Sequence, residues 1–476
     1  MSQTQPLRKS SGWRQRLLRL LPWHRRLALV ASIGVLSWAL SGMLHPLMTA
    51  LQPQPATPMP PQTPLLLEGL QAPRDVLQAA GIAQVQALRL IVLDGEAWYQ
   101  VRLAGQLTPR YWNARSGAAA DLSERHAEHL AAHFLGSTEA LKASITLNQF
   151  GAEYAYINRL LPVVQVNTAR DDGLRVYVDL FQDRLGTLVD DRKALFSSAF
   201  LNLHSFAWLD GTGSFRPLLM LLLLGAVLLT VLMGISLFAA RRQARTTLRR
   251  LHGIGGVGLA ILSLGFASSA CWHVLHKHTA QPAPAGFTPT LDVSALTTAP
   301  NGSWLEAHET LQRVSLLQLD GKPIWRLQGQ RFGKLPTLRY VDALGQPLDD
   351  IAPLRYAEQR FAHYARQLGL AEPKTITLQT QFDHEYGFVM KRLPVLKAHY
   401  ADDQRTSLYI DPVDGALSAH ITQPDRLEGF SFAYLHKWAF LNDWSKTGKD
   451  VLLTLAALAH LLLVAGGLWL YRQRRR

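Results

Sequence analysis

Residues 150–164 read FGAEYAYINRLLPVV, and residues 382–396 read FDHEYGFVMKRLPVL. Both stretches contain a Glu-Tyr pair followed by a proline at the same spacing. A match at constant separation between distant parts of one chain indicates an internal repeat. We therefore interpret the chain as a duplication, with an offset of 232 at this point. The matched residues are Glu153, Tyr154 and Pro162 in the first half and Glu385, Tyr386 and Pro394 in the second.

Further matches keep the same order along the chain. A Leu-Asp-Gly turn and a Leu-His pair of the first half each recur in the second half, and so does a pair of histidines at one fixed spacing. Each half is therefore expected to hold a helix leading out of a membrane, an outside domain and a helix leading back. The recurring segments are 93–95 with 319–321, 203–204 with 435–436, and His24 and His45 with His252 and His273.

The net positive charge of the chain arises from three short segments. The 476 residues carry a formal charge of +14, and 16 of the 49 Lys and Arg residues lie in 1–26, 241–250 and 472–476, where there is no acid. A nucleic-acid-binding protein carries its charge on a folded face. Here the charge flanks apolar runs, which is the positive-inside pattern of a membrane protein. We therefore expect no nucleic-acid partner.

Four apolar runs are long enough to cross the hydrocarbon core of a bilayer, which takes about 20 residues. The first run is too long for a signal peptide and lacks a small-residue cleavage site, so we expect it to be retained. The basic flanks place both termini in the cytoplasm of a bacterial inner-membrane protein. The expected segments are a basic N-terminus at 1–26, spans at 27–48, 217–240, 253–275 and 450–471, periplasmic domains at 49–216 and 276–449, a cytoplasmic loop at 241–252 and a cytoplasmic tail at 472–476.

Each outside region opens with a proline-rich linker and then alternates β-rich runs with amphipathic stretches. Residues 174–181 and 407–411 are rich in β-branched and aromatic residues, and 121–135 and 353–369 have a helical pattern. This mixture predicts α+β domains with antiparallel sheets. The predicted fold class is a membrane α protein with α+β parts: a four-helix transmembrane bundle with two duplicated periplasmic domains.

The layout resembles the PepSY-associated transmembrane family of bacterial inner-membrane proteins. The similar segments are the basic-His starts of spans (23–26 and 250–253), Ser41-Gly42, the runs VYVDLFQDRLG and LYIDPVDGALS, and LHSFAW and LHKWAF before spans. The resemblance implies PepSY-like domains, haem b held in the helix bundle and an activity like that of siderophore-linked iron reductases. Some members carry a fused flavin reductase domain. We expect none here, which leaves a quinol or a cytoplasmic reductase as the electron donor.

Histidines in the apolar runs and at their ends support haem independently, because an ionisable side chain inside a membrane is costly and imidazole is an axial ligand of haem iron. The separation of His24 from His45 corresponds to about 31 Å of helix. His24 and His252 are therefore expected near the cytoplasmic face, and His45 and His273 near the periplasmic face. We predict that His45 and His273 share one iron, with His24 and His252 as the analogous pair. Interfacial histidines among lipid headgroups are the alternative.

Three further histidines are candidates. His460 lies near the middle of the last apolar run, at mid-bilayer, and is a candidate ligand or relay, with a buried hydrogen-bonded histidine as the alternative. His204 and His436 precede two of the spans beside aromatic residues. They are candidates to ligate or cap the periplasmic haem, and an interfacial aromatic belt is the alternative.

The outside domains offer two weaker candidate sites. Charged and aromatic residues of the repeated stretch are candidates to line a cleft for an iron chelate, although a strand with one solvated face is the preferred interpretation. Three histidines at i, i+3 and i+7 share one helix face and resemble a metal site, although a solvated polar face is the preferred interpretation. The chelate candidates are Glu153, Tyr154, Arg159, Glu385, Tyr386 and Arg392, and the metal candidates are His126, His129 and His133.

The combined hypothesis is a haem b protein with two haems that reduces a periplasmic ferric chelate such as a siderophore. Reduction to Fe(II) weakens binding by hard oxygen ligands because the ionic charge falls. No residue is assigned as catalytic, because electron transfer needs a path and a docking surface. Two alternatives remain: a non-enzymatic anchored protein that binds or inhibits a periplasmic partner, and a haem-free metal-uptake accessory.

The orientation of the spans is directly testable. A reporter fused within 241–250 is expected to be active as a cytoplasmic fusion, and a reporter within 300–420 as a periplasmic one, because basic loops stay in the cytoplasm. Paired alkaline phosphatase and fluorescent-protein fusions measure this. The reverse labelling would contradict the predicted direction of electron flow.

Overall fold

A computed structural model of the chain describes residues 12–137, 139–240, 246–280, 282–301, 308–331, 337–387 and 390–473. The chain divides into two compact units. Unit 1 comprises Met1–Leu51, Lys193–Gln281 and Pro424–Arg476, and unit 2 comprises Gln52–Arg192 and Pro282–Gln423. The fold is α+β, with helices and several small antiparallel sheets. Unit 1 is helical and unit 2 holds the sheets, which agrees with the predicted combination of a helical part and α+β parts.

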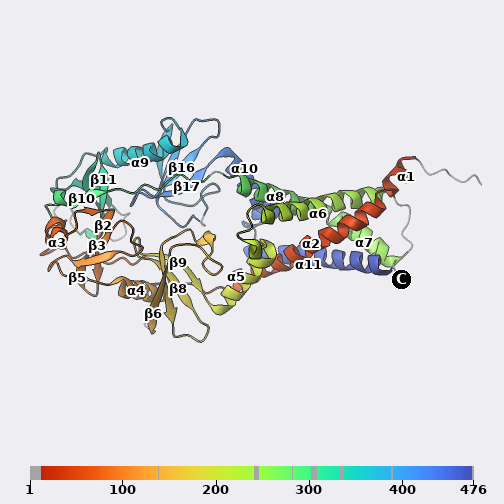
Figure 1. Cartoon of the computed structure of the whole chain (residues 1–476), viewed down its shortest axis with the longest axis horizontal. Helices are drawn as coiled ribbons and strands as arrows, with labels where there is room; N and C mark the ends of the chain where they lie inside the picture. Colours follow the sequence, from red (N-terminus) through yellow and green to blue (C-terminus); the bar gives the residue numbers. More distant parts are fainter. Residues whose placement is uncertain are drawn as a thin grey trace, which may run out of the picture. The chain divides into compact units, whose positions relative to one another are not determined.

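Long apolar helices make up most of unit 1 (Figure 1). Three helical segments are long and apolar enough to cross a membrane: Gly12–Leu51, Phe215–Ala240 and Lys446–Gln473. They contain α1 (Gly12–Leu18) with α2 (Leu21–Leu51), α6 (Phe215–Ala240) and α11 (Lys446–Gln473). Helix α2 packs against both α6 and α11. These helices match three of the four predicted spans.

The predicted span at 253–275 differs from expectation because it is not one straight helix. It is divided into α7 (Thr247–Gly258) and α8 (Ala260–Thr279), which meet at an angle of 51°. Glycines at 253, 255, 256 and 258 crowd the end of α7. Glycine weakens a helix by about 1 kcal/mol relative to alanine, so a run of them favours a break. The pair counts as a fourth crossing only if both helices together form one broken span.

The two halves of unit 2 share one seven-stranded sheet, in the order β13-β12-β11-β2-β3-β4-β5. Strand β2 (Ala87–Leu93) pairs antiparallel with β11 (Thr310–Leu319). The sequence predicted two separate domains, whereas this pairing joins them into one unit. Pairing removes two exposed strand edges at once. The other strands are β3 (Glu96–Arg102), β4 (Arg110–Asn113), β5 (Ala119–Ala120), β12 (Lys322–Gln330) and β13 (Thr337–Asp342).

The repeated Leu-Asp-Gly segments form the tight turns of two equivalent hairpins, β2–β3 and β11–β12. The Asp and Gly of each turn have positive φ angles, 54° and 79° at Asp94 and Gly95, and 52° and 75° at Asp320 and Gly321. Two-residue hairpin turns need this left-handed backbone, which Asp-Gly adopts readily. One face of the resulting sheet buries a large apolar core that includes Tyr99, Trp112 and Trp325, while residues of both halves contribute to it.

Each half also contains a four-stranded antiparallel sheet and a long amphipathic helix. The first half has β6 (Leu141–Leu147), β7 (Val163–Thr168), β8 (Arg175–Asp179), β9 (Arg184–Val189) and α4 (Ser123–Leu135). The second half has β14 (Thr375–Gln379), β15 (Val395–His399), β16 (Ser407–Ile410), β17 (Leu417–Ile421) and α9 (Ala352–Leu368). These elements confirm the strands predicted at 174–181 and 407–411 and the helices predicted at 121–135 and 353–369.

Polar contacts of the two halves repeat as closely as the strands do. The Tyr177 hydroxyl donates to Glu153 Oε1 at 2.5 Å, and the Tyr409 hydroxyl donates to Glu385 Oε1 at the same distance. The step from Tyr177 to Tyr409 equals the step from Glu153 to Glu385. The duplication inferred from the sequence is therefore present in the side-chain packing.

The shared sheet predicts that the two halves of unit 2 unfold together. Trp325 on β12 is 1% exposed in the core that both halves build. We expect Trp325→Ala to lower the free energy of unfolding of unit 2 by about 3–5 kcal/mol. Leu338→Ala, on the neighbouring β13 and 40% exposed, is the matched control and is expected to change it by less than about 0.5 kcal/mol.

Hydrogen exchange of the full chain measures this effect strand by strand. Protection is expected to fall in β2 and β3 as well as in β11 and β12. Loss of protection confined to the second half would show that the halves fold independently.

Candidate functional site

His204 ends helix α5 (Asp191–His204) in unit 1 and is held from two sides. Ser41 Oγ lies 2.9 Å from His204 Nδ1, and Trp38 Nε1 donates to the His204 carbonyl oxygen at 3.0 Å. The imidazole stacks on Phe200, one helical turn earlier, with ring centroids 4.7 Å apart. Both the position and the orientation of the ring are thus determined by α2 and α5 together.

His436 has the equivalent environment in the second half of the chain. It ends the π-helical turn η5 (Phe432–His436), which follows α10 (Gln423–Ser431). Its Nδ1 lies 3.4 Å from Ser269 Oγ, and its ring stacks on Phe432 at 4.8 Å. The step from Ser41 to Ser269 equals the step from His45 to His273. The step from Phe200 to Phe432 equals the step from His204 to His436. The serine-imidazole-phenylalanine arrangement is therefore part of the duplication.

The two imidazoles come together in unit 1. The ring centroids of His204 and His436 are 6.0 Å apart and the rings are nearly perpendicular, at 86°. Burial lowers the pKa of His204 to about 3, with a further contribution from His436. Burial likewise lowers the pKa of His436 to about 4, although a hydrogen bond with the Phe266 backbone opposes this shift. Both rings are therefore neutral near pH 7, which is the form that binds metals.

The pair predicted to share an iron, His45 and His273, lies beside the same two phenylalanines. The His45 ring is 5.8 Å from Phe200, and the His273 ring stacks on Phe432 at 4.6 Å. His273 Nδ1 also lies 2.5 Å from Glu428 Oε1, in the arrangement by which a carboxylate orients a metal-binding imidazole. No contact between His45 and His273 is found in the part of the chain that the structure describes, so their sharing an iron stays a prediction.

The predicted cytoplasmic pair also shows the duplication. The His24 ring lies against Gly234 of α6, and the His252 ring lies against Gly467 of α11. A Cβ atom at these glycines would lie 3.5 Å from His24 Cε1 and 3.0 Å from His252 Cε1. Small residues at both places let an imidazole approach the neighbouring helix. His24 Nδ1 additionally lies 3.1 Å from the Thr230 carbonyl oxygen.

His460 lies within α11 and both of its ring nitrogens have partners. Nε2 lies 2.9 Å from Ser263 Oγ of α8, and Nδ1 lies 2.7 Å from the Ala456 carbonyl oxygen. Its ring is also 6.2 Å from that of Phe266, which in turn is 5.6 Å from His436. These contacts match the alternative of a hydrogen-bonded histidine, and a ligand role for His460 stays a prediction.

Most residues proposed for chelate binding have structural contacts in unit 2. Tyr154 and Tyr386 are 1% and 0% exposed, and the two hydroxyls donate to the backbone carbonyls of Leu160 and Arg392. Glu153 accepts from Arg175 as well as from Tyr177, and Arg159 packs over the Tyr156 ring. These bonds account for the repeated Glu-Tyr pair as packing residues of the fold.

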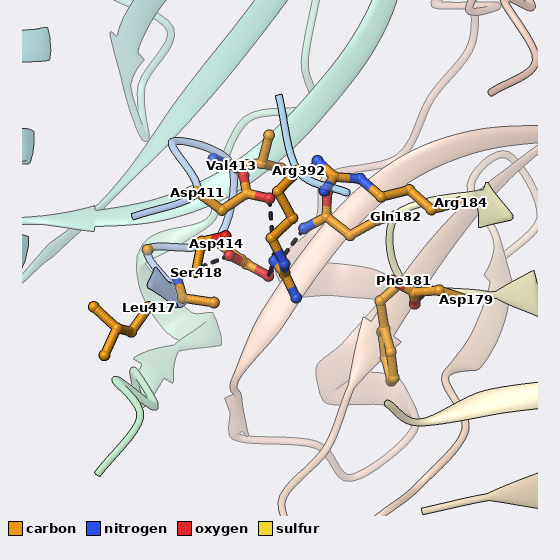
Figure 2. A network of polar contacts seen from close by, with 12 residues as sticks. Asp179, Phe181, Gln182, Arg184, Arg392, Asp411, Val413, Asp414, Leu417 and Ser418 are labelled. Atoms are coloured by element: carbon orange, nitrogen blue, oxygen red, sulfur yellow. Dashed lines mark hydrogen bonds and ion pairs between the residues drawn. The ribbon is translucent and has the colours of Figure 1, made fainter. Parts of the chain in front are cut away.

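Arg392 lies in a buried network that joins the two halves of unit 2 (Figure 2). Its Nη1 donates to Asp411 Oδ2 at 3.1 Å, and Arg184 Nη2 from the first half donates to the same oxygen at 3.0 Å. Gln182 Nε2 donates to Asp414 Oδ2 at 2.9 Å. Arg392 therefore stabilises the junction between halves, and chelate binding by it stays a prediction.

The three histidines of helix α4 do not share one environment. His126 is 4% exposed, with Nε2 3.1 Å from Asp183 Oδ1 and Nδ1 3.0 Å from the Tyr111 hydroxyl. His129 is exposed, and His133 Nε2 lies 2.9 Å from the Met59 carbonyl oxygen. The expectation of one solvated polar face is wrong for His126, because Asp183 and Tyr111 give it buried partners. Within the described residues no group of three or more His, Cys, Asp or Glu side chains could hold a metal ion.

Sequence reasoning missed the residues that surround the candidate histidines. Ser41, Ser269, Phe200 and Phe432 were not assigned roles, although the two repeat offsets match them in pairs. It also missed Arg89, whose guanidinium donates to Asp183 at 2.6 and 2.5 Å. No local motif marks that ion pair, because its members lie far apart in the sequence.

No protein-family model matches the chain, and no curated protein matches it in sequence.

The Arg89–Asp183 pair predicts a pH-dependent stability. Burial alone would raise the pKa of Asp183, but the Arg89 guanidinium and the hydrogen bond with His126 hold it well below its usual range. A carboxylate with a depressed folded-state pKa stabilises the fold above its unfolded pKa of about 3.9, and this contribution is lost as the pH falls toward the folded value. We expect Asp183→Asn to destabilise unit 2 by about 3–5 kcal/mol at pH 7, because it leaves Arg89 buried and unpaired.

Denaturant unfolding of the full chain at several pH values measures this difference. The gap between wild type and variant is expected to be constant above about pH 5 and to shrink below about pH 4. The exposed Asp121→Asn is the control and is expected to leave stability nearly unchanged. A pH-independent gap would show that charge plays no part in the Asp183 contribution.

Proposed function

We propose that this chain is a bacterial inner-membrane haem b protein that passes electrons across the membrane to a periplasmic ferric chelate, such as a siderophore, and so releases its iron. This makes it a ferric-chelate reductase. The observation that carries the proposal is the pairing of His204 with His436, two neutral imidazoles 6.0 Å apart in unit 1. In this proposal α7 and α8 form one broken span, so that four spans place both termini in the cytoplasm.

The donor set of this pair fits haem iron. Bis-imidazole ligation needs two neutral rings, each with one nitrogen left for the metal and the other engaged by a hydrogen bond that orients the ring. Ser41 and Ser269 occupy the Nδ1 side of His204 and His436. Nε2 is therefore the nitrogen that we assign to the metal in both residues. Haem b, when bound, supplies an iron that alternates between Fe(III) and Fe(II).

The surrounding side chains act on these imidazoles rather than on the substrate. Phe200 and Phe432 stack on the two rings and fix their planes. Ser41 and Ser269 hold one tautomer by keeping Nδ1 hydrogen-bonded. Burial keeps both rings unprotonated, which preserves a lone pair on Nε2.

A second haem is proposed for the other histidines. His24 and His252 occupy equivalent places against Gly234 and Gly467, and a haem there would lie toward the opposite end of the helices. His45 and His273 are the alternative pair on the side of His204 and His436. The electron donor is proposed to be a quinol or a cytoplasmic reductase, with membrane lipid around the spans and unit 2 as the part that meets the chelate.

The proposal is tested by a reduced-minus-oxidised absorption spectrum of the purified full chain, with haem quantitation. We expect b-type bands, and about two haems per chain. His204→Ala and His436→Ala are each expected to reduce the haem content or convert one haem from six- to five-coordinate, and the double variant should add little because the two residues act as a unit.

His399→Ala, on β15 in unit 2, is the control and should leave the spectrum unchanged. Loss of the low-spin spectrum in His45→Ala and His273→Ala, with His204→Ala and His436→Ala intact, would move the site to the pair first predicted. Absence of haem from protein purified from haem-replete cells would contradict the proposal. It would favour a membrane-anchored binding protein or a haem-free metal-uptake accessory.

A further inference from the structure

A row of polar side chains crosses the seven-stranded sheet of unit 2 on the face opposite the large apolar core. Directly paired residues of neighbouring strands point to the same face of a sheet, so the pairing register identifies the row. Ser315 of β11 is paired both with Arg89 of β2 and with Arg326 of β12. The complete row, from β13 to β4, is Tyr340, Arg326, Ser315, Arg89, Gln100 and Tyr111.

In the first half of the chain the positive charge of this row is neutralised. Arg89 makes two hydrogen bonds to the carboxylate of Asp183, which also accepts from His126. Arg89 Nη2 further donates to the Leu180 carbonyl oxygen at 2.8 Å, and Nε donates to Gln100 Oε1. The buried guanidinium is thus held by partners at each of its three nitrogens.

The second half has the opposite chemistry at the equivalent positions. The step from Gln100 to Arg326 equals the step from Asp94 to Asp320 in the two hairpin turns. Arg326 therefore occupies in the second half the position that Gln100 occupies in the first. The step from Asp183 to Gly415 equals the step from Glu153 to Glu385, so Gly415 occupies the position of Asp183 in the second half. The second half therefore has a guanidinium at the position of Gln100 and no carboxylate at the position of Asp183, although the Asp411 carboxylate interacts electrostatically with Arg326.

Arg326 is buried without an ion pair among the described residues. It is 2% exposed, and although its side chain is hydrogen-bonded to Tyr340, its Nε and Nη1 atoms have no partner within the described structure. The Oγ of its neighbour Ser315, 5% exposed, has no partner in the same part of the chain either. A guanidinium cannot escape this situation by losing its proton, and an unpaired buried charge is strongly destabilising.

Two further arginines raise the positive charge around Arg326. Arg313 lies two positions before Ser315 on β11, so the two side chains share a face of the sheet. Burial lowers the pKa of Arg313 to about 10. The positive charges of Arg89, Arg326 and Arg184 lower this pKa further, whereas the Asp183 carboxylate raises it. Arg184 uses Nη2 for Asp411, and its buried Nη1 has no partner in the described part of the chain (Figure 2).

We propose that Arg326, Arg313 and Ser315 bind a small oxyanion, the carboxylate or phosphate group of a ligand, which supplies the negative charge that Asp183 supplies in the first half. The N–H groups of a guanidinium donate charge-assisted hydrogen bonds to the oxygens of such a group, and the serine hydroxyl supplies a further donor. The unpartnered nitrogens of Arg326 are shielded from solvent, so the anion is expected to enter by local opening of the surrounding turns. This site is independent of the proposed haem function.

The test is thermal unfolding of the purified full chain in rising concentrations of inorganic phosphate and, in parallel, of citrate. Sodium chloride keeps the ionic strength constant. A ligand that binds only the folded state raises the unfolding temperature in proportion to the logarithm of its concentration above the dissociation constant. We expect such a rise with at least one of the two anions. A rise with phosphate only, or with citrate only, identifies the type of oxyanion that the site prefers.

Arg326→Gln places at this position the residue that the first half has at 100. It is expected to weaken the anion response at least about tenfold, as for loss of a charge-assisted hydrogen bond, without lowering stability in anion-free buffer. Arg110→Gln, an exposed arginine on β4 of the same sheet, is the matched control and should keep the full response.

Two results would overturn the proposal. One is the absence, in wild type, of any rise in unfolding temperature beyond that with chloride. The other is an equal response in wild type and Arg326→Gln. Should Arg326→Gln not fold, Ser315→Ala keeps both charges and removes only the hydroxyl; it is expected to weaken the response, and an unchanged response would count against the site.

Discussion

A hydrogen-bonding or charged group that leaves water must find a partner, and this constraint governs both units of the chain. In unit 1 the imidazoles of His204 and His436 are buried, and a serine hydroxyl from the neighbouring helix meets the Nδ1 side of each. In unit 2 the Arg89 guanidinium is buried and meets Asp183. An unsatisfied buried group costs about 1–3 kcal/mol, and a charged one more, so these partners determine which packing arrangements survive.

The duplication makes this constraint informative, because each half acts as a reference for the other. The Tyr-Glu bonds of unit 2 are repeated in both halves, and their residues maintain the fold. Where the chemistry has diverged, one half has acquired something the other lacks. Glu428 beside His273 stands where the first half has Phe196, and Arg326 stands where it has Gln100. Divergent polar residues inside a repeated scaffold are therefore the places where we assign new chemistry.

Local patterns in the sequence were sufficient to predict the elements that depend on local physics. The Asp-Gly turns at 94–95 and 320–321, the helices near α4 and α9 and three apolar helices are all found. Each depends on backbone preference or on hydrophobic periodicity within one short stretch of chain. Features that depend on distant residues could not be predicted in this way. The pairing of β2 with β11 joins strands from opposite halves of the chain, and it turned two expected domains into one unit.

The burial of His126 depends on Asp183, which no periodicity connects to it. A run of glycines marks the break between α7 and α8, but the apolar content of 253–275 predicted one continuous span. The proximity of His204 and His436 follows from the packing of separate helical segments. We propose that these two residues together hold one haem iron. Low-temperature electron paramagnetic resonance of the oxidised full chain tests it most directly, because the signal reports the axial ligands of each ferric haem. We predict a low-spin signal of a bis-imidazole haem that changes to high-spin, or is lost, in His204→Ala and in His436→Ala alike. A low-spin signal that both variants leave unchanged would contradict it.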